Sequence, residues 1–251
     1  MKNYYFLAGL PRAGNTLLGC LINQNLKTTC LSPNSIITEI IYRLVDIKRD
    51  DSFHNFPEHR GLDKIINNVF NLYYDHLSQE HIIDRGPWGT PFNYAISKNI
   101  PVKNKKYIIL YRPILECLAS YIKICKFKMN EELEDKCIEL CSKEGLFGKN
   151  MWSIANLIKQ KEKVHIIRYE KLIKDPEKII NSLLEYLKIK ETFKLKNKLK
   201  QFDLNGCSYN DSMLEGPLHT IKTDNIEKTE YDIKDYVPKS IIKKYKGSDL
   251  L

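Results

Sequence analysis

The sequence of 251 residues lacks any apolar stretch near the roughly 18 residues that a membrane-spanning helix needs. Its first apolar run, residues 4–8, is also too short for the hydrophobic part of a secretory signal, and no charged lead of any length precedes it. We therefore expect no membrane span, and we expect the chain to work in the cytoplasm.

Cysteine is present but lacks a pattern for pairing or metal binding. The seven cysteines are odd in number, and no C-x-x-C pair occurs. Cys137 and Cys141 lie one helical turn apart, but no histidine or further cysteine is near them in sequence to complete a metal site. Buried thiols in a reducing compartment explain this pattern better than disulfides do. We expect no metal site.

Arginine is scarce, although the net charge is +9. Only seven of the forty basic residues are arginine, and the lysines are spread over polar stretches such as 188–190 and 194–200. A basic surface suits a small anionic ligand as well as it suits nucleic acid. Because the lysines do not mark a binding face, we expect no nucleic-acid partner.

What the sequence does contain is an alternation of short apolar strands and amphipathic helices. Strand patterns occur at 3–8, 81–84, 106–111 and 164–168. Helical periodicity covers about 15–26, 35–48, 61–77, 91–98, 114–126, 131–143, 149–161, 176–187 and 193–201. This alternation predicts an α/β fold of three layers, with a parallel β-sheet flanked by helices. The length suits a single domain over residues 1–251, with its α/β core at 1–201.

The last segment, residues 202–251, differs from the rest. It has few periodic runs and several turn-forming residues, among them Asn205-Gly206, Gly216-Pro217, Pro238 and Gly247. Fifty residues of this kind have little core of their own. We therefore expect a C-terminal lid or arm that packs over the sheet rather than a second domain.

The stretch GLPRAGNT, residues 9–16, joins the first predicted strand to the first predicted helix. Its spacing is nearly that of a phosphate-binding loop, G-x-x-x-x-G-K-[ST], but Asn15 replaces the lysine. Gly9 and Gly14 let the backbone approach an anion closely, and the helix offers its first N–H groups. Arg12 can grip a terminal anionic group with two hydrogen bonds. Taken alone, the stretch also fits an ordinary strand-to-helix turn.

Four of the seven arginines follow predicted strands: Arg12, Arg85, Arg112 and Arg168. The carboxyl ends of parallel strands meet at one edge of a sheet, so we expect these arginines to share one rim. Ser120 lies eight residues after Arg112, about two turns into the next helix, and the two side chains can converge on a second anion. Alone, this pair fits a surface arginine and a helix serine better.

Four segments resemble sequence blocks of the sulfotransferase family. GLPRAGNTLL (9–18) resembles its loop for a 5′-phosphosulfate, and YRPILECLASY (111–121) its 3′-phosphate motif. RYEKLIKDP (168–176) resembles the later Tyr-Glu…Asp-Pro segment, and IDRGPW (83–88) is similar to the block that carries the active-site lysine. The blocks occur in the order of the family and span residues 4 to about 187.

The resemblance implies a P-loop NTPase-like sulfotransferase fold and a donor, 3′-phosphoadenosine 5′-phosphosulfate (PAPS). The acceptor would be a hydroxyl or amine of a small molecule, glycan or peptide. PAPS has no γ-phosphate and needs no catalytic Mg²⁺, which would account for Asn15. The resemblance further implies a 3′-phosphate on Arg112 and Ser120 and an adenine near Tyr169. The 5′-phosphosulfate would bind to Arg12, Ala13, Gly14, Asn15, Thr16 and Leu17, and arm residues His219 and Lys222 would close over the donor.

Two positions depart from the family. Arg85 stands where the lysine is usual, and Asn15 stands where serine or threonine is usual. The resemblance implies that Arg12 and Arg85 stabilise charge on the transferring and leaving oxygens. Arginine supplies that charge, but it does not donate a proton near neutral pH.

The catalytic base is less apparent from the sequence. Glu39, on the helix predicted at 35–48, is our candidate, because in relatives that region borders the acceptor. Asp84 is a rival, although a structural hydrogen-bonding role suits it better. His54 and His59, in a loop-like stretch, are weaker candidates.

Two other functions stay open from the sequence. A P-loop kinase for nucleotides or small molecules would need a carboxylate for magnesium, which Asp84 could supply, and a lysine for the phosphates, which is absent. A non-catalytic nucleotide-binding module would keep Arg112 and Ser120 and would have lost the acceptor side.

Overall fold

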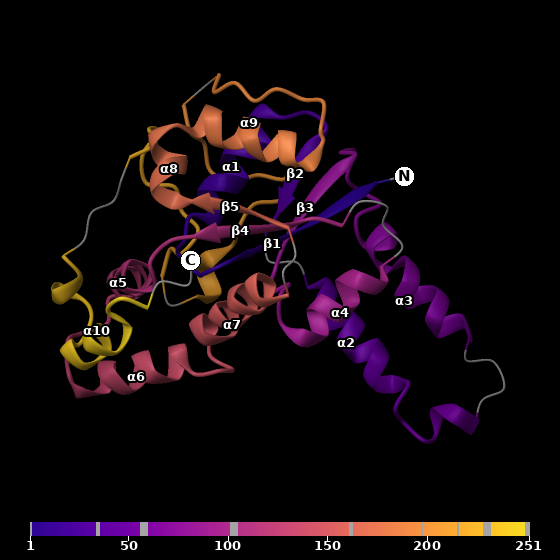
Figure 1. The fold of residues 1–251 in the computed structure, drawn as a ribbon, viewed down its shortest axis with the longest axis horizontal. Helices are drawn as coiled ribbons and strands as arrows, with labels where there is room; N and C mark the ends of the chain where they lie inside the picture. Colours follow the sequence, from indigo (N-terminus) through magenta and orange to yellow (C-terminus); the bar gives the residue numbers. More distant parts are fainter. Residues whose placement is uncertain are drawn as a thin grey trace.

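A five-stranded parallel sheet of order β2-β3-β1-β4-β5 forms the centre of the computed structural model (Figure 1). The structure describes residues 2–33, 36–55, 60–100, 105–160, 163–196, 198–214, 216–227 and 232–248. The strands are β1 (Asn3–Gly9), β2 (Thr29–Ser32), β3 (His81–Arg85), β4 (Tyr107–Tyr111) and β5 (Val164–Arg168). The predicted α/β fold with a parallel sheet is confirmed.

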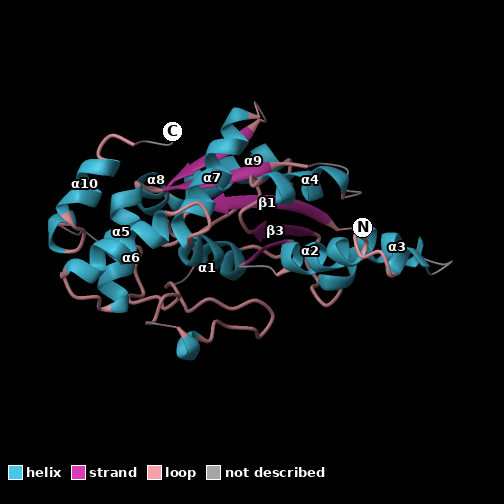
Figure 2. Cartoon of the chain, turned by 90° about the horizontal axis from the view of Figure 1, so that it is seen from below, coloured by secondary structure: helices cyan, strands magenta, loops and turns pink. Residues whose placement is uncertain are grey.

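Helices cover both faces of the sheet and give the three expected layers (Figures 1 and 2). One face carries α1 (Asn15–Asn25), α8 (Tyr169–Lys174) and α9 (Pro176–Leu187). The other carries α4 (Pro91–Asn99) and α7 (Leu146–Lys159), with α2 (Ile37–Ile47) and α3 (Arg60–Tyr73) reaching out beside them. At the opposite end of the molecule, α5 (Ile114–Cys125), α6 (Glu131–Cys141) and α10 (Lys239–Tyr245) gather. The described part of the chain also forms short 3-10 helices: η1 (Phe53–Asn55), η2 (Asp211–Met213) and η3 (Ile233–Asp235).

The central strands are buried on both faces, which explains their continuous apolar sequences. Every residue of β4 is buried, and β1 is buried from Tyr4 to Gly9. In a sheet that helices cover on both sides, both faces of a strand are buried, so its residues are apolar throughout and do not alternate with polar ones. Because these strands cannot shift without exposing apolar surface, they hold the loops at their carboxyl ends in fixed positions.

Among the described residues, one strand and two α-helices escape the sequence patterns. The strand is β2, the four residues TCLS, which pairs with β3 at the edge of the sheet and is too short and polar to stand out. The helix α8 follows β5 directly, without the turn residues that usually mark a new element. The third is α10, whose seven residues hold too little apolar periodicity to be noticed.

The helix predicted over 193–201 is wrong. The described residues of this segment have no helix, and they run past α1 in an irregular path. The Gln24 side chain donates to the Lys200 carbonyl at 2.9 Å, and the Leu199 amide donates to the Asp224 carbonyl at 2.8 Å. These partners replace the helical hydrogen bonds, because a segment rich in lysine has little apolar surface to bury as a helix.

The arm that follows crosses α1 and then reaches α5 and α6. The Phe202 ring lies against Gly19 of α1, where an added Cβ would come within 2.8 Å of the ring. Gln201 and Ile221 exchange two hydrogen bonds, of 2.6 and 2.9 Å, which close residues 201–221 into a loop. Further on, Ile241 of α10 is buried, and this helix contacts α5 and α6.

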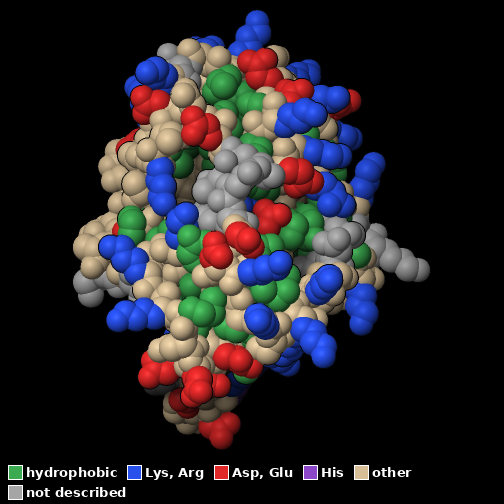
Figure 3. Space-filling view, turned by 90° about the vertical axis from the view of Figure 1, so that its left-hand side faces the viewer, with side chains coloured by type: hydrophobic (Ala, Val, Ile, Leu, Met, Phe, Trp, Pro, Cys, Tyr) green, Lys and Arg blue, Asp and Glu red, His purple; other side chains and the backbone are tan. Residues whose placement is uncertain are grey.

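Figure 3 shows the face that lies on the left of Figure 1, toward which the strands run. Lysine and arginine side chains are spread across this face, with aspartate and glutamate among them. Within the described ranges, no helix combines the length and the apolar character that crossing a membrane requires.

Candidate active site

A cavity of about 360 Å³ lies at the carboxyl ends of β1, β3 and β4. One part of its wall is the loop after β1, from Pro11 to Leu17 with the exception of the buried Ala13. Other parts come from the ends of β3 and β4 and from α5 and α8. The arm closes the remaining side with Tyr209, Leu214 and residues 218–221. The loop, the strand ends and the arm thus meet at one site.

The loop after β1 is curled by two residues in the left-handed region. Arg12 has φ 64° and Gly14 has φ 103°. Glycine is required at position 14 for two reasons. Its positive φ disfavours residues with a side chain, and an added Cβ would lie 2.7 Å from the Tyr169 ring. Gly14 caps α1 without a side-chain hydrogen bond, and the first turn of α1 holds no acidic residue. The first amide groups of α1 are therefore suited to an anionic ligand.

The Asn15 side chain stabilises this loop through a hydrogen bond to the loop backbone. Its Nδ2 donates to the Leu10 carbonyl at 2.8 Å. Its Oδ1 is buried and accepts no hydrogen bond from the described residues, and an added Cβ on Gly9 would lie 2.8 Å from it. The residue that replaces the usual lysine thus serves the shape of the loop, and it brings no positive charge to the cavity.

Arg112 is held on three sides at the end of β4. Its side chain donates to the Arg12 carbonyl at 3.2 Å and forms an ion pair with Glu116 at 3.0 Å. Its guanidinium carbon lies 4.3 Å from the centre of the Tyr169 ring. Arg112 is only 3% exposed, so its position is fixed before any ligand binds. Glu116 balances part of its charge, which sequence reasoning did not anticipate.

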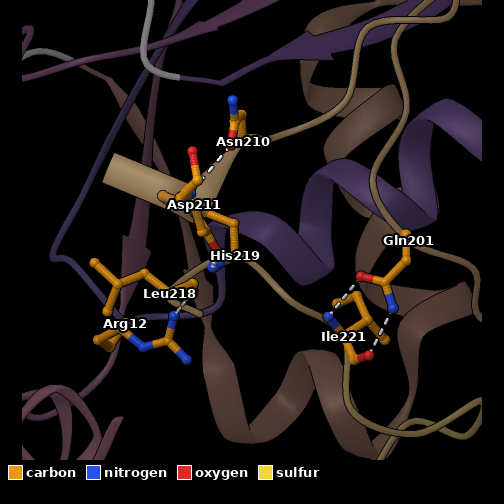
Figure 4. A network of polar contacts seen from close by, with 8 residues as sticks. Arg12, Gln201, Asn210, Asp211, Leu218, His219 and Ile221 are labelled. Carbon is orange, nitrogen blue, oxygen red and sulfur yellow. Dashed lines mark hydrogen bonds and ion pairs between the residues drawn. The ribbon is translucent and has the colours of Figure 1, made fainter. Parts of the chain in front are cut away.

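Ser120 connects α5 to the loop after β1. It is buried on α5, and Nε of Arg12 donates to its Oγ at 3.4 Å. Another nitrogen of Arg12, Nη1, donates to the Leu218 carbonyl of the arm (Figure 4). Arg12 therefore joins the loop, α5 and the arm around the cavity.

Arg85 enters the cavity from the end of β3. Its Nη2 is 3.5 Å from the Gly9 carbonyl. Burial lowers the pKa of Arg85, while the neighbouring Tyr209 and Asp84 act in the opposite direction. The guanidinium remains charged at neutral pH, because arginine does not lose its proton in proteins.

Asp84 precedes Arg85 but faces the core. It is fully buried, and its carboxylate accepts hydrogen bonds from the Tyr74 hydroxyl and, at 3.1 Å, from Nε1 of Trp88. These contacts join β3 to the residue just after α3 and to the turn that follows the strand. They are the contacts of a structural residue, which is the role that suited Asp84 better from the sequence.

The arm contributes a stack of polar side chains. The rings of Tyr209 and His219 are parallel, with centres 3.9 Å apart. His219 Nδ1 lies 2.6 Å from Oδ1 of Asp211, and the His219 amide donates to Oδ2 of the same carboxylate at 2.8 Å (Figure 4). Burial raises the pKa of Asp211, but the hydrogen bonds from His219 and the charge of Arg12 outweigh this and lower it.

Tyr209 links this stack to the strand ends. The Tyr209 hydroxyl hydrogen-bonds with the Thr16 side chain. The phenol also lies near enough to Arg85 for an electrostatic interaction with the guanidinium. Burial raises the pKa of Tyr209 to about 12, although Arg85 and Thr16 act against this shift. The phenol is therefore neutral over the physiological range. Sequence reasoning did not find Tyr209 or Asp211, because neither lies in a motif.

The structure gathers most of the sequence-predicted site residues around the cavity. Of the residues predicted to bind the donor, only Ala13 and Lys222 do not line it: Ala13 is buried, and Lys222 is exposed on the arm. Arg168 also lies outside, with its guanidinium carbon 5.3 Å from the centre of the Tyr111 ring. Its strand, β5, is at the edge of the sheet, two places from β1. Three of the four predicted rim arginines thus reach the cavity.

Glu39 and His54, two of the predicted bases, lie outside the cavity wall. The Glu39 side chain is 63% exposed and forms an ion pair with Arg43 at 3.0 Å, outside the cavity wall. His54 is exposed in η1, and His59 lies outside the described residues. Among the described residues, no group of three histidine, cysteine, aspartate or glutamate side chains is arranged to hold a metal.

The sequence matches the sulfotransferase domain family over residues 2–246, and the chain therefore belongs to the sulfotransferase family. A solved structure of the sulfotransferase domain from the Synechococcus PCC 7002 olefin synthase is 17% identical. The match covers 90% of this chain and 86% of that one, with a TM-score of 0.52. A sulfotransferase from Alicyclobacillus acidocaldarius is 12% identical, with 80% and 87% covered and a TM-score of 0.52. No curated protein matches the sequence. These identities show the fold alone; the family match confirms the predicted resemblance.

Proposed function

We propose that this sulfotransferase moves a sulfuryl group from PAPS to a hydroxyl or amine of a small-molecule, glycan or peptide acceptor. The observation that carries the proposal is a pair of anion-binding features in one cavity. One is the uncapped start of α1 with Arg12, and the other is the buried pair Arg112 and Ser120. They lie side by side, because Arg12 Nε is 3.4 Å from Ser120 Oγ. A nucleotide with one anionic group at its 5′ end and another at its 3′ end suits both.

The loop favours this donor over ATP. A γ-phosphate needs the P-loop lysine as its point charge, and Asn15 here braces the loop instead. A kinase also needs a carboxylate that holds Mg²⁺. Asp84, near the end of β3, is the sequence candidate for that carboxylate, but Tyr74 and Trp88 occupy its oxygens in the core.

The chemistry that we propose is an in-line displacement at sulfur. The acceptor oxygen forms a bond to sulfur while the bond from sulfur to the bridging oxygen breaks, and 3′,5′-ADP leaves with that oxygen. Positioning and charge stabilisation supply most of the rate in transfers of this kind. Arg12 and Arg85 would stabilise the transferring and leaving oxygens, and Tyr169, which lies between Gly14 and Arg112, would contact the adenine. Action in the cytoplasm remains part of the proposal.

The test is a transfer assay with ³⁵S-labelled PAPS and a mixture of phenols, alcohols, amines and sugars. We expect label in an organic product and one 3′,5′-ADP released for each label transferred. A parallel reaction with γ-³²P-ATP and Mg²⁺ should transfer no label. Transfer from ATP alone would establish a kinase instead. Tight binding of 3′,5′-ADP with no transfer to any acceptor would establish a binding module.

A further inference from the structure

The strand ends that form the cavity supply positive charge but no base. Arg12, Arg85 and Arg112 are cations. Asp84, the carboxylate beside them, is buried and hydrogen-bonded in the core. Glu116 faces the cation of Arg112. An acceptor hydroxyl must lose its proton when it attacks sulfur, so the proton acceptor has to come from another part of the cavity wall.

The arm brings an imidazole to that wall. His219 lines the cavity, and its Nδ1 lies 2.6 Å from Oδ1 of Asp211. Asp211 has a lowered pKa and is ionised at neutral pH, so it accepts the proton of Nδ1. In neutral histidine this leaves Nε2 as the nitrogen with a lone pair. A carboxylate that fixes the tautomer of a histidine in this way is the arrangement that general bases use.

The imidazole is also fixed in orientation. Tyr209 covers one face of its ring, parallel to within 2° and 3.9 Å away. Tyr209 in turn hydrogen-bonds with Thr16 and lies near Arg85. The neighbouring carbonyl of Leu218 accepts a hydrogen bond from Arg12. His219 is thus tied to Thr16 of the loop and to Arg12 and Arg85, to which the proposed function assigns the transferring and leaving oxygens.

We infer that Nε2 of His219 is the proton acceptor of the transfer reaction, and that Asp211 positions it. This inference rests on the proposed function. The acceptor oxygen attacks sulfur, its proton moves to Nε2, and the bridging oxygen departs with 3′,5′-ADP. The imidazolium then returns its proton to water. Among the described residues, the imidazole contacts the Asp211 carboxylate and the neutral phenol of Tyr209, and the Arg12 guanidinium lies near enough to Asp211 to act on that carboxylate.

The experiment uses water as the acceptor, because it needs no knowledge of the natural one. Release of 3′,5′-ADP from PAPS is followed from pH 5 to pH 9 in the wild type and in His219→Gln. Glutamine preserves the backbone hydrogen bond to Asp211. We expect an acid limb in the wild-type profile of kcat. His219→Gln should lower kcat by roughly 10²- to 10⁴-fold, the range of a general base, remove that acid limb, and change the donor KM by less than about threefold.

Three further variants separate a base from a structural residue. In His219→Ala, added imidazole should restore part of the rate. Asp211→Asn should also lower kcat, and the double variant with His219→Gln should be no slower than His219→Gln alone, because the two residues act as one unit. His76→Gln changes an exposed histidine between α3 and β3 and is the matched control, with unchanged kcat.

The outcomes distinguish this inference from the proposed function. An unchanged kcat in His219→Gln, or a raised donor KM with the same kcat, would overturn the base and make His219 a donor-binding residue at most. A wild type that binds 3′,5′-ADP in calorimetry but releases none from PAPS would overturn the base and leave the nucleotide site standing. A wild type that does neither would overturn the proposed function, and this inference with it.

Discussion

The rim of the sheet and the C-terminal arm build the same cavity from different kinds of residue. The rim supplies Arg12, Arg85 and Arg112, each at or just after the end of a buried strand. The arm supplies Tyr209 and His219, ten residues apart, which stack because residues 201–221 close into a loop. Fixed positive charge therefore comes from the rigid sheet, whereas the groups suited to proton transfer come from a segment that tertiary contacts hold in place.

The largest effect at the rim should follow from removing the charge of Arg85. Arg85→Ala should lower turnover by roughly 10²- to 10³-fold, because a preorganised charge at the leaving oxygen acts mainly in the transition state. Affinity for 3′,5′-ADP should change by less than about tenfold. Arg85→Lys should recover much of the rate, since an ammonium restores the charge. Steady-state kinetics and calorimetry on the same preparations measure both effects.

Arg168→Ala is the matched control for this substitution. It removes an arginine that also ends a strand but lies outside the cavity. We expect turnover close to that of the wild type. Near-normal turnover in Arg85→Ala would instead make Arg85 structural and would assign the leaving group to another cation.

The second effect concerns affinity at the rim. Arg112→Ala should weaken 3′,5′-ADP by about 2–3 kcal/mol, the scale of a charged hydrogen bond, and should barely change AMP. Glu116→Gln should act in the opposite direction. The substitution removes the ion pair of Arg112, in which the Glu116 side chain is partly exposed. Binding of 3′,5′-ADP should therefore become stronger by about 0.5–1 kcal/mol. Equal losses for both nucleotides in Arg112→Ala would contradict the 3′-phosphate assignment.

The difference between the rim and the arm also decides which parts of the site can be predicted from the sequence. Four of the five strands, the loop 9–16 and the pair Arg112 and Ser120 are local patterns, visible within a dozen residues. Asp211 and Tyr209 lie in an irregular segment, and only the closure of the arm gives them a common position. The position of Glu39 is hidden from the sequence for a related reason: its helix extends away from the sheet (Figure 1), and periodicity does not report that direction.

The third effect tests the arm through stability. The folded pKa of Asp211 lies below its ordinary value of 3.8, so its ionised form stabilises the folded state above that pH. Asp211→Asn should lower the free energy of unfolding at pH 7 by about 1–2 kcal/mol, the worth of hydrogen bonds to a charged group. The difference should shrink as the pH falls below about 4, where the wild-type carboxylate becomes protonated.

Urea unfolding at several pH values measures this difference. Asp224→Asn is the control, because the Asp224 side chain is 67% exposed and its ion pair with Lys198 is long, at 3.6 Å. A pH-independent loss in Asp211→Asn would show that the ionisation of Asp211 does not stabilise the arm.

The smallest expected effect is that of a chelator. With a donor that has no γ-phosphate and with Asn15 in place of the lysine, turnover should survive EDTA with a change of less than about twofold. The assay is the transfer of ³⁵S from PAPS before and after chelation. A complete loss that Mg²⁺ restores would favour triphosphate chemistry at the rim.

Calorimetry with 3′,5′-ADP, AMP and ATP–Mg²⁺ on the wild type tests the central claim most directly, because it asks whether the rim is built for two separate anions. We expect 3′,5′-ADP to bind without metal and roughly 30- to 150-fold more tightly than AMP, as a 3′-phosphate contact worth about 2–3 kcal/mol requires. ATP–Mg²⁺ should bind more weakly than 3′,5′-ADP. Equal affinities for 3′,5′-ADP and AMP, or a preference for ATP–Mg²⁺, would contradict the assignment of the cavity to PAPS.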